Sequence, residues 1–295
     1  MKRLIYILSL AFVFAACQNE APLPPTLIME GWIDADGFPV IMIHQTYVLD
    51  AAPDTARSIE EIAEELLIPF GKVTVSDGTD QVVLTGRIDT AYLPPYIYTS
   101  VYMTGESGKT YTVTAQYKDF YASATTTIPP VASLDSLRIR QNGSLEVDVR
   151  AFMSGVGTDG EAYYALFARR IDTKQFRLCP LCVFSYEDAR DGNLEMKVYN
   201  PVADTTNIMG RNHYFQNDTT LSVRDRTYQL KVARIDKASY RFWKAYNEQV
   251  LTSGVFFVPV YKNIPSNVEG GYGNISGMGS SFYYFNLSRD TTYRY

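Results

Sequence analysis

Apolar and polar residues alternate along much of the chain with a period of two, which is typical of strands that bury one face of a sheet. The segment Thr110–Tyr117 is the clearest case, since Tyr111, Val113 and Ala115 fall on one face and threonines fill the other. A further strand is predicted over Thr227–Asp236. The pattern therefore predicts a protein built mainly of β-sheet.

Two turn signals within alternating segments predict β-hairpins. Asp77-Gly78 lies in a four-residue loop between apolar strands. Farther along, a three-residue loop over Gln141–Gly143 would place glycine where a left-handed residue is needed. The two hairpins would pair Val75 with Val82, Val73 with Leu84, Ile139 with Leu145, and Leu137 with Val147.

Two segments have the spacing of an amphipathic helix. The first, over Ser58–Pro69, begins at a serine suited to an N-cap and stops at a proline. The second, at about 237–251, follows Asp236 and carries Tyr240, Trp243 and Tyr246 on one stripe. We interpret this stripe as a surface that packs on a sheet rather than as a cofactor site.

Proline residues within Thr125–Val131 interrupt the sheet pattern, because proline cannot donate a hydrogen bond to a ladder. We therefore place a domain boundary near Pro130. The expected fold is mainly β. An immunoglobulin-like β-sandwich would span residues 27–130, and a second β-sandwich or barrel-like domain with one or two short helices would span residues 131–295.

Composition agrees with a globular β-protein and argues against one class of function. Hydrophobic residues make up 46% of the chain and charged residues 20%, which suits a chain that buries a core. The abundance of tyrosine and phenylalanine favours sheet. The formal net charge of −5 and the lack of a basic stripe argue against a nucleic-acid partner.

The N-terminus predicts export and attachment to a membrane. Residues 1–16 have a short positive start and an apolar run that ends in small residues, as signal peptides do. Phe14–Cys17 resembles a bacterial lipobox, in which the cysteine becomes lipidated; the alternative is an ordinary cleavable signal. Lipid on Cys17 would anchor the protein in the outer membrane, and residues 17–26 would form a proline-rich tether. No later segment is apolar enough to predict a spanning helix.

Several stretches resemble those of one family when they are taken in order: LIMEGWID, VTVSDG, GKTYTVTA, TTTIPPVASLDSL, CPLC, SYRFWKAYNEQ and NIPSNVEGGYGNISG. The chain is similar to domain-of-unknown-function family 4249 over nearly the whole mature part. Its last stretch lacks the aromatic residue that usually follows the final glycine of the family motif. The resemblance implies an exported, β-rich outer-membrane lipoprotein of Bacteroidetes, often encoded beside TonB-dependent receptors, and it transfers no catalytic residue.

Cys179 and Cys182 form a CxxC pair. In an exported protein we interpret the pair as a short disulfide that closes a turn. Zinc binding would need two further ligands, and a redox pair would be expected at the start of a helix in an α/β fold. These two alternatives stay open.

We find no catalytic constellation in the sequence. The two histidines, His44 and His213, lie in no recognisable nucleophile motif. Asp34–Gly37 and Asp188–Asn193 place carboxylates near glycine, as calcium loops do, but both also fit hairpin turns. We therefore expect no cofactor and no metal.

A tyrosine-rich stretch is the candidate for contact with a ligand or partner. Tyr92, Tyr96, Tyr98 and Tyr102 surround a pair of prolines. Exposed on a stiff loop, such rings could stack on sugars or contact a partner protein. The alternative is ordinary packing at the edge of a sheet.

Together these features predict a non-catalytic, lipid-anchored protein of the outer membrane. The first hypothesis is an accessory or ligand-binding component of a TonB-dependent uptake system, with the receptor as its partner. The second is a structural or adhesive component of the cell surface. The third is a hydrolase that uses two carboxylates.

Overall fold

The computed structural model of the protein describes residues 26–46, 66–92, 95–143, 146–201, 214–216, 222–223, 226–252 and 264–295. The predicted signal peptide, Cys17, nearly all of the tether and most of the predicted helix over Ser58–Pro69 lie outside these residues. Within them the protein is mainly β, with three sheets and one α-helix. The prediction of a mainly β, sandwich-like fold is confirmed.

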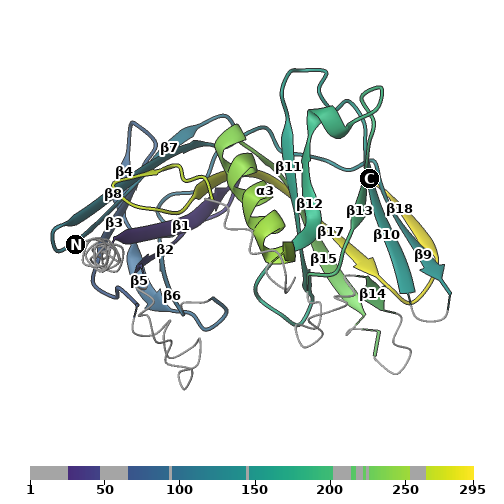
Figure 1. Ribbon diagram of the computed structural model, residues 1–295, viewed down its shortest axis with the longest axis horizontal. Coiled ribbons are helices and arrows are strands. Elements are labelled where there is room, and N and C mark those ends of the chain that lie inside the picture. The colour runs from purple at the N-terminus through teal and green to yellow at the C-terminus, as the bar shows by residue number, and fades with distance from the viewer. Residues whose placement is uncertain are drawn as a thin grey trace, which may run out of the picture.

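One long sheet of eight strands runs through the molecule (Figure 1). At its centre β1 (Leu27–Asp34) and β17 (Ile275–Asn286) run parallel, with Gly31 opposite Ile275, so an early strand pairs with a late one. The order across the sheet is β12 (Arg177–Ser185), β11 (Tyr163–Arg170), β15 (Thr227–Ile235), β17 (Ile275–Asn286), β1 (Leu27–Asp34), β2 (Val40–Gln45), β6 (Tyr96–Thr99) and β5 (Thr85–Ile88).

Two five-stranded sheets cover one face of the long sheet and form two sandwiches that share it. On β17, Ile275 points into the first core, while Tyr283 and Phe285 point into the second; all three have the same parity, so both cores lie on one face. The first covering sheet contains β16 (Val268–Glu269), β8 (Phe120–Thr127), β7 (Thr110–Tyr117), β3 (Lys72–Ser76) and β4 (Gln81–Val83). The second contains β13 (Leu194–Val198), β10 (Glu146–Met153), β9 (Ser136–Asn142) and β18 (Thr291–Arg294), with β14 (Phe215–Gln216) beside β10.

The chain passes from one sandwich to the other over residues 127–132, and it crosses β17 there. Gly277 and Gly279 make the crossing possible, since a Cβ at these positions would lie 2.6 and 2.4 Å from backbone oxygens of the crossing segment. Pro130, the predicted boundary, lies where the chain changes core. Because both cores share one sheet, the division into two domains stays a prediction, as does the immunoglobulin-like type of the first sandwich.

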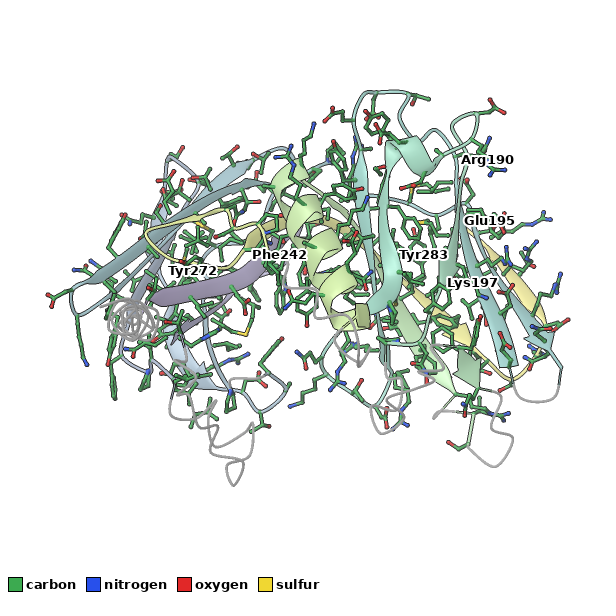
Figure 2. All side chains as sticks on the ribbon, viewed as in Figure 1. Arg190, Glu195, Lys197, Phe242, Tyr272 and Tyr283 are labelled. Carbon is green, nitrogen blue, oxygen red and sulfur yellow. The ribbon has the colours of Figure 1, made fainter. Side chains whose placement is uncertain are left out.

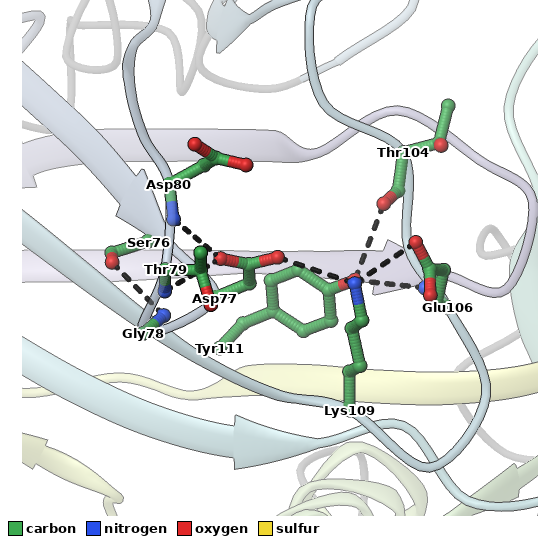
Figure 3. A network of polar contacts seen from close by, with 9 residues as sticks. All are labelled: Ser76, Asp77, Gly78, Thr79, Asp80, Thr104, Glu106, Lys109 and Tyr111. Carbon is green, nitrogen blue, oxygen red and sulfur yellow. Dashed lines mark hydrogen bonds and ion pairs between the residues drawn. The ribbon is translucent and has the colours of Figure 1, made fainter.

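The first predicted hairpin is confirmed, with Val75 opposite Val82. A polar network holds its turn (Figure 3). Asp77 Oδ1 accepts the N–H groups of residues 79 and 80 at 3.0 and 2.8 Å, and Lys109 Nζ lies 3.3 Å from the other oxygen. These backbone hydrogen bonds, with Lys109, lower the pKa of Asp77.

The second predicted hairpin forms, but its register is wrong. Ile139 lies opposite Val149 rather than Leu145, and Asn142 lies opposite Glu146. The two strands again leave three residues between them, and the first of these, Gly143, has a φ of 73°. Each partner moves by four residues, an even number, so the same side chains face the core in both registers.

We call the face of the long sheet that the two smaller sheets do not cover its open face. Helix α3 (Lys237–Thr252) lies on this open face (Figure 1), and the prediction of a helix there is confirmed. Asp236 caps it, since its Oδ1 accepts the N–H of Ser239 at 2.7 Å. Its Oδ2 accepts the hydroxyl of Thr126 at 2.8 Å, and that hydroxyl oxygen accepts the N–H of Gly277 at 2.7 Å. The start of the helix is thereby fixed to β8 and β17. A short 3-10 helix, η1 (Tyr186–Asp188), follows β12.

Candidate functional site

A cleft of about 840 Å³ lies on the face of the long sheet that carries α3. Residues of β1, β2, β11, β15 and β17 line it together with α3 and the segments around 87–92 and 174–178. Phe242, labelled in Figure 2, belongs to the helix side of the cleft. The volume falls in the range of small-molecule sites, about 300–1,000 Å³.

Alternation along the strands supplies the floor of the cleft. On β1 the odd-numbered residues, such as Met29 and Ile33, point into the first core. Glu30, Trp32 and Asp34 lie on the other face and point into the cleft. On β15, Leu230 points into the second core and Lys231 into the cleft. The same sequence pattern that builds the sandwiches therefore presents charged and aromatic groups on the opposite face.

Among the described residues, nine aromatic side chains line the cleft. Trp32 lies 5.9 Å from Tyr92 and Phe167 lies 5.4 Å from Trp243, measured between ring centroids. Such faces can stack on flat apolar parts of a ligand. The nine are Trp32, Phe38, Tyr92, Phe167, Phe176, Phe242, Trp243, Tyr246 and Phe282.

A buried ion pair lies within the cleft. Lys231 Nζ is 2.6 Å from Asp34 Oδ1, and the two side chains are 6% and 16% exposed. The hydroxyl of Ser280 donates to the same oxygen at 2.6 Å. These groups come from the neighbouring strands β15, β17 and β1, so the pair joins the two halves of the long sheet. Because the two charges neutralise each other, the pair adds no net charge to the cleft.

A second polar group lies between α3 and β17. Trp243 Nε1 donates to Ser276 Oγ at 3.1 Å, and Asn274 Nδ2 donates to the same oxygen at 2.6 Å. Asn274 lines the cleft and is 3% exposed, and its Oδ1 has no hydrogen-bond partner among the described residues. A buried polar atom without a partner is costly, so this oxygen opposes the gain from the two hydrogen bonds to Ser276.

Basic side chains gather at one end of the cleft, where a recess of about 340 Å³ adjoins it. Lys174, Gln175 and Arg177 line both spaces, and Arg169 lines the recess. The guanidinium of Arg169 donates to Gln229 Oε1 and to the carbonyl oxygens of residues 173 and 174. These hydrogen bonds hold both the guanidinium and the segment that carries Lys174.

The structure places the four candidate tyrosines in different surroundings. Tyr92 lines the cleft, and burial raises the pKa of its hydroxyl. Tyr98 is 2% exposed, donates to the carbonyl oxygen of Ile68, and has its pKa raised to about 12 by burial. Tyr96 is half-buried, whereas Tyr102 is 87% exposed outside the cleft. Of the four, Tyr92 alone lines the cleft.

Cys179 and Cys182 are free thiols in the structure, and the disulfide between them stays a prediction. Both are buried within β12 rather than placed at a turn, at a bulge where residues 179–182 oppose the single residue Leu166 of β11. The thiol of Cys182 donates to the carbonyl oxygen of Lys197 at 3.3 Å. Burial raises the pKa of the Cys179 thiol well above its ordinary value, so it stays protonated and packs as a small apolar group.

The other sequence candidates lie apart from one another. His44 is on β2, with its Nε2 3.8 Å from a carboxylate oxygen of Glu30, and His213 lies outside the described residues. Asp34 belongs to the ion pair of the cleft, while Asp188 accepts hydrogen bonds from the residue before η1. In the described part of the chain, no group of three or more His, Cys, Asp or Glu side chains could hold a metal ion.

Sequence reasoning missed most of the cleft. One signal could have indicated it: Lys231 lies inside the apolar strand TYQLKVARI, where a buried lysine needs a partner. The aromatic stripe of α3 does pack on the sheet, as the contact of Trp243 with Phe167 shows, but it also forms part of the cleft.

The fold and the site define a β-sandwich protein with a ligand-sized aromatic cleft on the open face of a shared sheet. Residues 18–281 match the family described as Domain of unknown function (DUF4249), and the chain belongs to this family. The resemblance found in the sequence is thereby confirmed. No curated protein matches the chain. Within the described residues, no helix has the length and apolar character to span a membrane.

Proposed function

We propose that this protein is a non-catalytic binding protein that holds a small ligand in the aromatic cleft, as a lipid-anchored accessory of a TonB-dependent uptake system in the outer membrane. The observation that carries the binding role is the cleft itself, whose described residues combine nine aromatic rings with a few fixed polar groups. Concave, largely apolar sites with a small number of oriented polar groups are typical of small-molecule binding.

The positions of the carboxylates favour binding over hydrolysis. Glu30 and Asp34 are the carboxylates among the described residues of the cleft wall. They are four residues apart on one strand, which separates their Cα atoms by about 13 Å at roughly 3.3 Å per residue. Glycosidases use carboxylates about 5–10 Å apart. Asp34 is also held by Lys231 and Ser280, which limits its use as a base.

The placement in the outer membrane rests on the N-terminal sequence and on the family resemblance. Phe14–Cys17 resembles a lipobox, and lipid on Cys17 would keep the protein at a membrane surface. The resemblance implies proteins encoded beside TonB-dependent receptors. A tethered binding protein would raise the local concentration of its ligand next to such a receptor.

The test is isolation of the native protein from detergent-solubilised outer membranes. We expect a TonB-dependent receptor to co-purify, and native mass spectrometry to show a small molecule that leaves on denaturation. Trp32→Ala should release the small molecule, whereas Tyr102→Ala, which alters an exposed ring outside the cleft, should not. Cys17→Ala should move the protein out of the membrane fraction. Isolation without receptor and without small molecule would contradict the proposal.

A further inference from the structure

We infer that the ligand of the cleft is an organic anion, with a flat apolar body among the aromatic rings and a carboxylate or phosphate group in the basic recess. This inference rests on the proposed function and names the chemical class of its ligand.

The recess is positively charged. Of the described residues that line it, three are cationic, Arg169, Lys174 and Arg177, and none is acidic. Lys174 and Arg177 also line the cleft, so one ligand can occupy both spaces. Guanidinium and ammonium groups that converge on a small space are the usual partners of carboxylates and phosphates.

The charges of the recess are not cancelled within the described residues. Arg169 donates to neutral oxygens, and Lys174 and Arg177 form no ion pair there. In the cleft, Lys231 is neutralised by Asp34, which leaves Glu30 as the remaining acid of its wall.

The positive charge of the recess is opposite in sign to the net charge of the whole chain. The formal net charge is −5, so acidic groups outnumber basic ones over the chain as a whole. A basic recess in such a protein would select for an anion and would steer it to the cleft.

The charged and apolar parts of the site adjoin each other, which favours an organic anion over an inorganic one. The guanidinium carbon of Arg169 lies 4.8 Å from the ring centroid of Phe176, and that ring lies 5.7 Å from Phe282. Both phenylalanines line the cleft.

Three probes with one ring system and different charges test this assignment: 2-naphthoate, 2-naphthalenemethanol and 2-naphthylmethylammonium. Calorimetry on the full chain in dodecyl maltoside, against a blank of micelles alone, gives each dissociation constant. Quenching of tryptophan fluorescence reports the location, because both tryptophans of the chain line the cleft. We expect the anion to bind about tenfold more tightly than the alcohol, and the ammonium to bind most weakly.

Two double variants separate the recess from the overall charge. Lys174→Ser with Arg177→Ser removes two charges from the recess, and Lys72→Ser with Arg190→Ser removes two from exposed positions outside both spaces. Both pairs change the formal net charge from −5 to −7. The first should lose about tenfold in affinity for 2-naphthoate and keep its affinity for the alcohol, while the second keeps both.

Other results would overturn the inference in distinguishable ways. Equal binding of the three probes, or equal losses in the two double variants, would show that the site does not select for an anion. The proposal that the cleft binds a ligand would then still stand. Absence of tryptophan quenching by all three probes would overturn this inference and the proposed function together.

Discussion

The two faces of the long sheet come from the same alternating strands but have different chemistry. The face toward the covering sheets buries apolar side chains such as Leu230, Val232 and Phe285. The face toward α3 carries the Lys231–Asp34 pair among aromatic rings. On one face two further sheets close the core, whereas on the other a single described helix covers part of the surface and leaves a cleft.

The comparison teaches that some polar groups on the floor of the cleft are tied to one another rather than left to solvent. Asp34 is held by Lys231 and Ser280, and Trp243 is held by Ser276. Fixed polar groups keep their positions without a ligand, which lowers the cost of binding one. We call the face toward the covering sheets the inner face. Changes in side-chain volume should therefore affect stability most on the inner face, and changes in charge or in ion pairing should affect it most on the open face.

The largest effect is expected from a matched pair of phenylalanines on β17. Phe285 is 1% exposed and contacts Phe215 and Tyr228 in the second core, whereas Phe282 lies on the open face and is 45% exposed. Phe285→Ala should lower the free energy of unfolding by about 3–5 kcal/mol, because it leaves a cavity. Phe282→Ala should lower it by less than about 1 kcal/mol. Urea denaturation measures both, and equal losses would contradict the difference between the faces.

Breaking the buried ion pair should have the next largest effect. Lys231→Met leaves Asp34 without its cation in a site where the carboxylate is 16% exposed, so we expect a loss of about 3 kcal/mol in the free energy of unfolding. The double variant Lys231→Met with Asp34→Asn carries no unpaired charge and should recover most of this loss. Urea denaturation at neutral pH compares the three proteins. A single variant as stable as the parent protein would show that the pair is not buried as the structure has it.

The parts of both faces that depend on residues close together in the sequence could be predicted from the sequence. The alternation of β7 and the stripe of α3 are local patterns, and both elements formed as expected. The hairpin at Asp77 had its register fixed by its turn. At Asn142 alternation allowed two registers with the same buried residues, and pattern alone could not choose between them.

The cleft could not be predicted because it depends on pairings that are distant in sequence. β1 lies beside β17, so Gly31 is paired with Ile275, and nothing local to either strand specifies the other. Asp34 and Lys231 meet only through that pairing. Of the four tyrosines singled out in the sequence, Tyr92 lines the cleft. Tyr96 and Tyr98 belong to β6, and their hydroxyls donate hydrogen bonds to the segment before β3 instead.

A smaller effect is expected at the start of α3, where Asp236 links the helix to β8 of a covering sheet. Asp236→Ala removes the N-cap of α3 and leaves the hydroxyl of Thr126 without its acceptor, so we expect a loss of about 2 kcal/mol in the free energy of unfolding. Asp236→Asn keeps an oxygen acceptor and should cost less than about 1 kcal/mol. Thermal denaturation followed by circular dichroism measures both. If alanine and asparagine are equally tolerated, the cap does not fix the helix to β8.

The smallest effect at moderate pH concerns the two thiols of the inner face. Burial raises the pKa of Cys179 above its value in the unfolded chain, so the unfolded thiol ionises first as pH rises. Its contribution to stability is therefore complete below the unfolded pKa and is lost as pH rises toward the folded one, by less than about 1 kcal/mol at pH 9. Urea denaturation at pH 7 and pH 9 should show a smaller change for Cys179→Ala than for the parent protein.

The same thiols test whether the inner face is closed. In the folded protein at pH 8 we expect neither Cys179 nor Cys182 to react with Ellman's reagent, because both are buried and the thiolate is the reactive form. Both should react at once in urea. Reaction in the folded state would show that β12 opens, and the inner face would then not be the rigid one. Failure to react in urea, followed by reaction after reduction, would instead mean that the pair is oxidised in the native protein. The bulge of β12 would then hold a disulfide in place of two packed thiols.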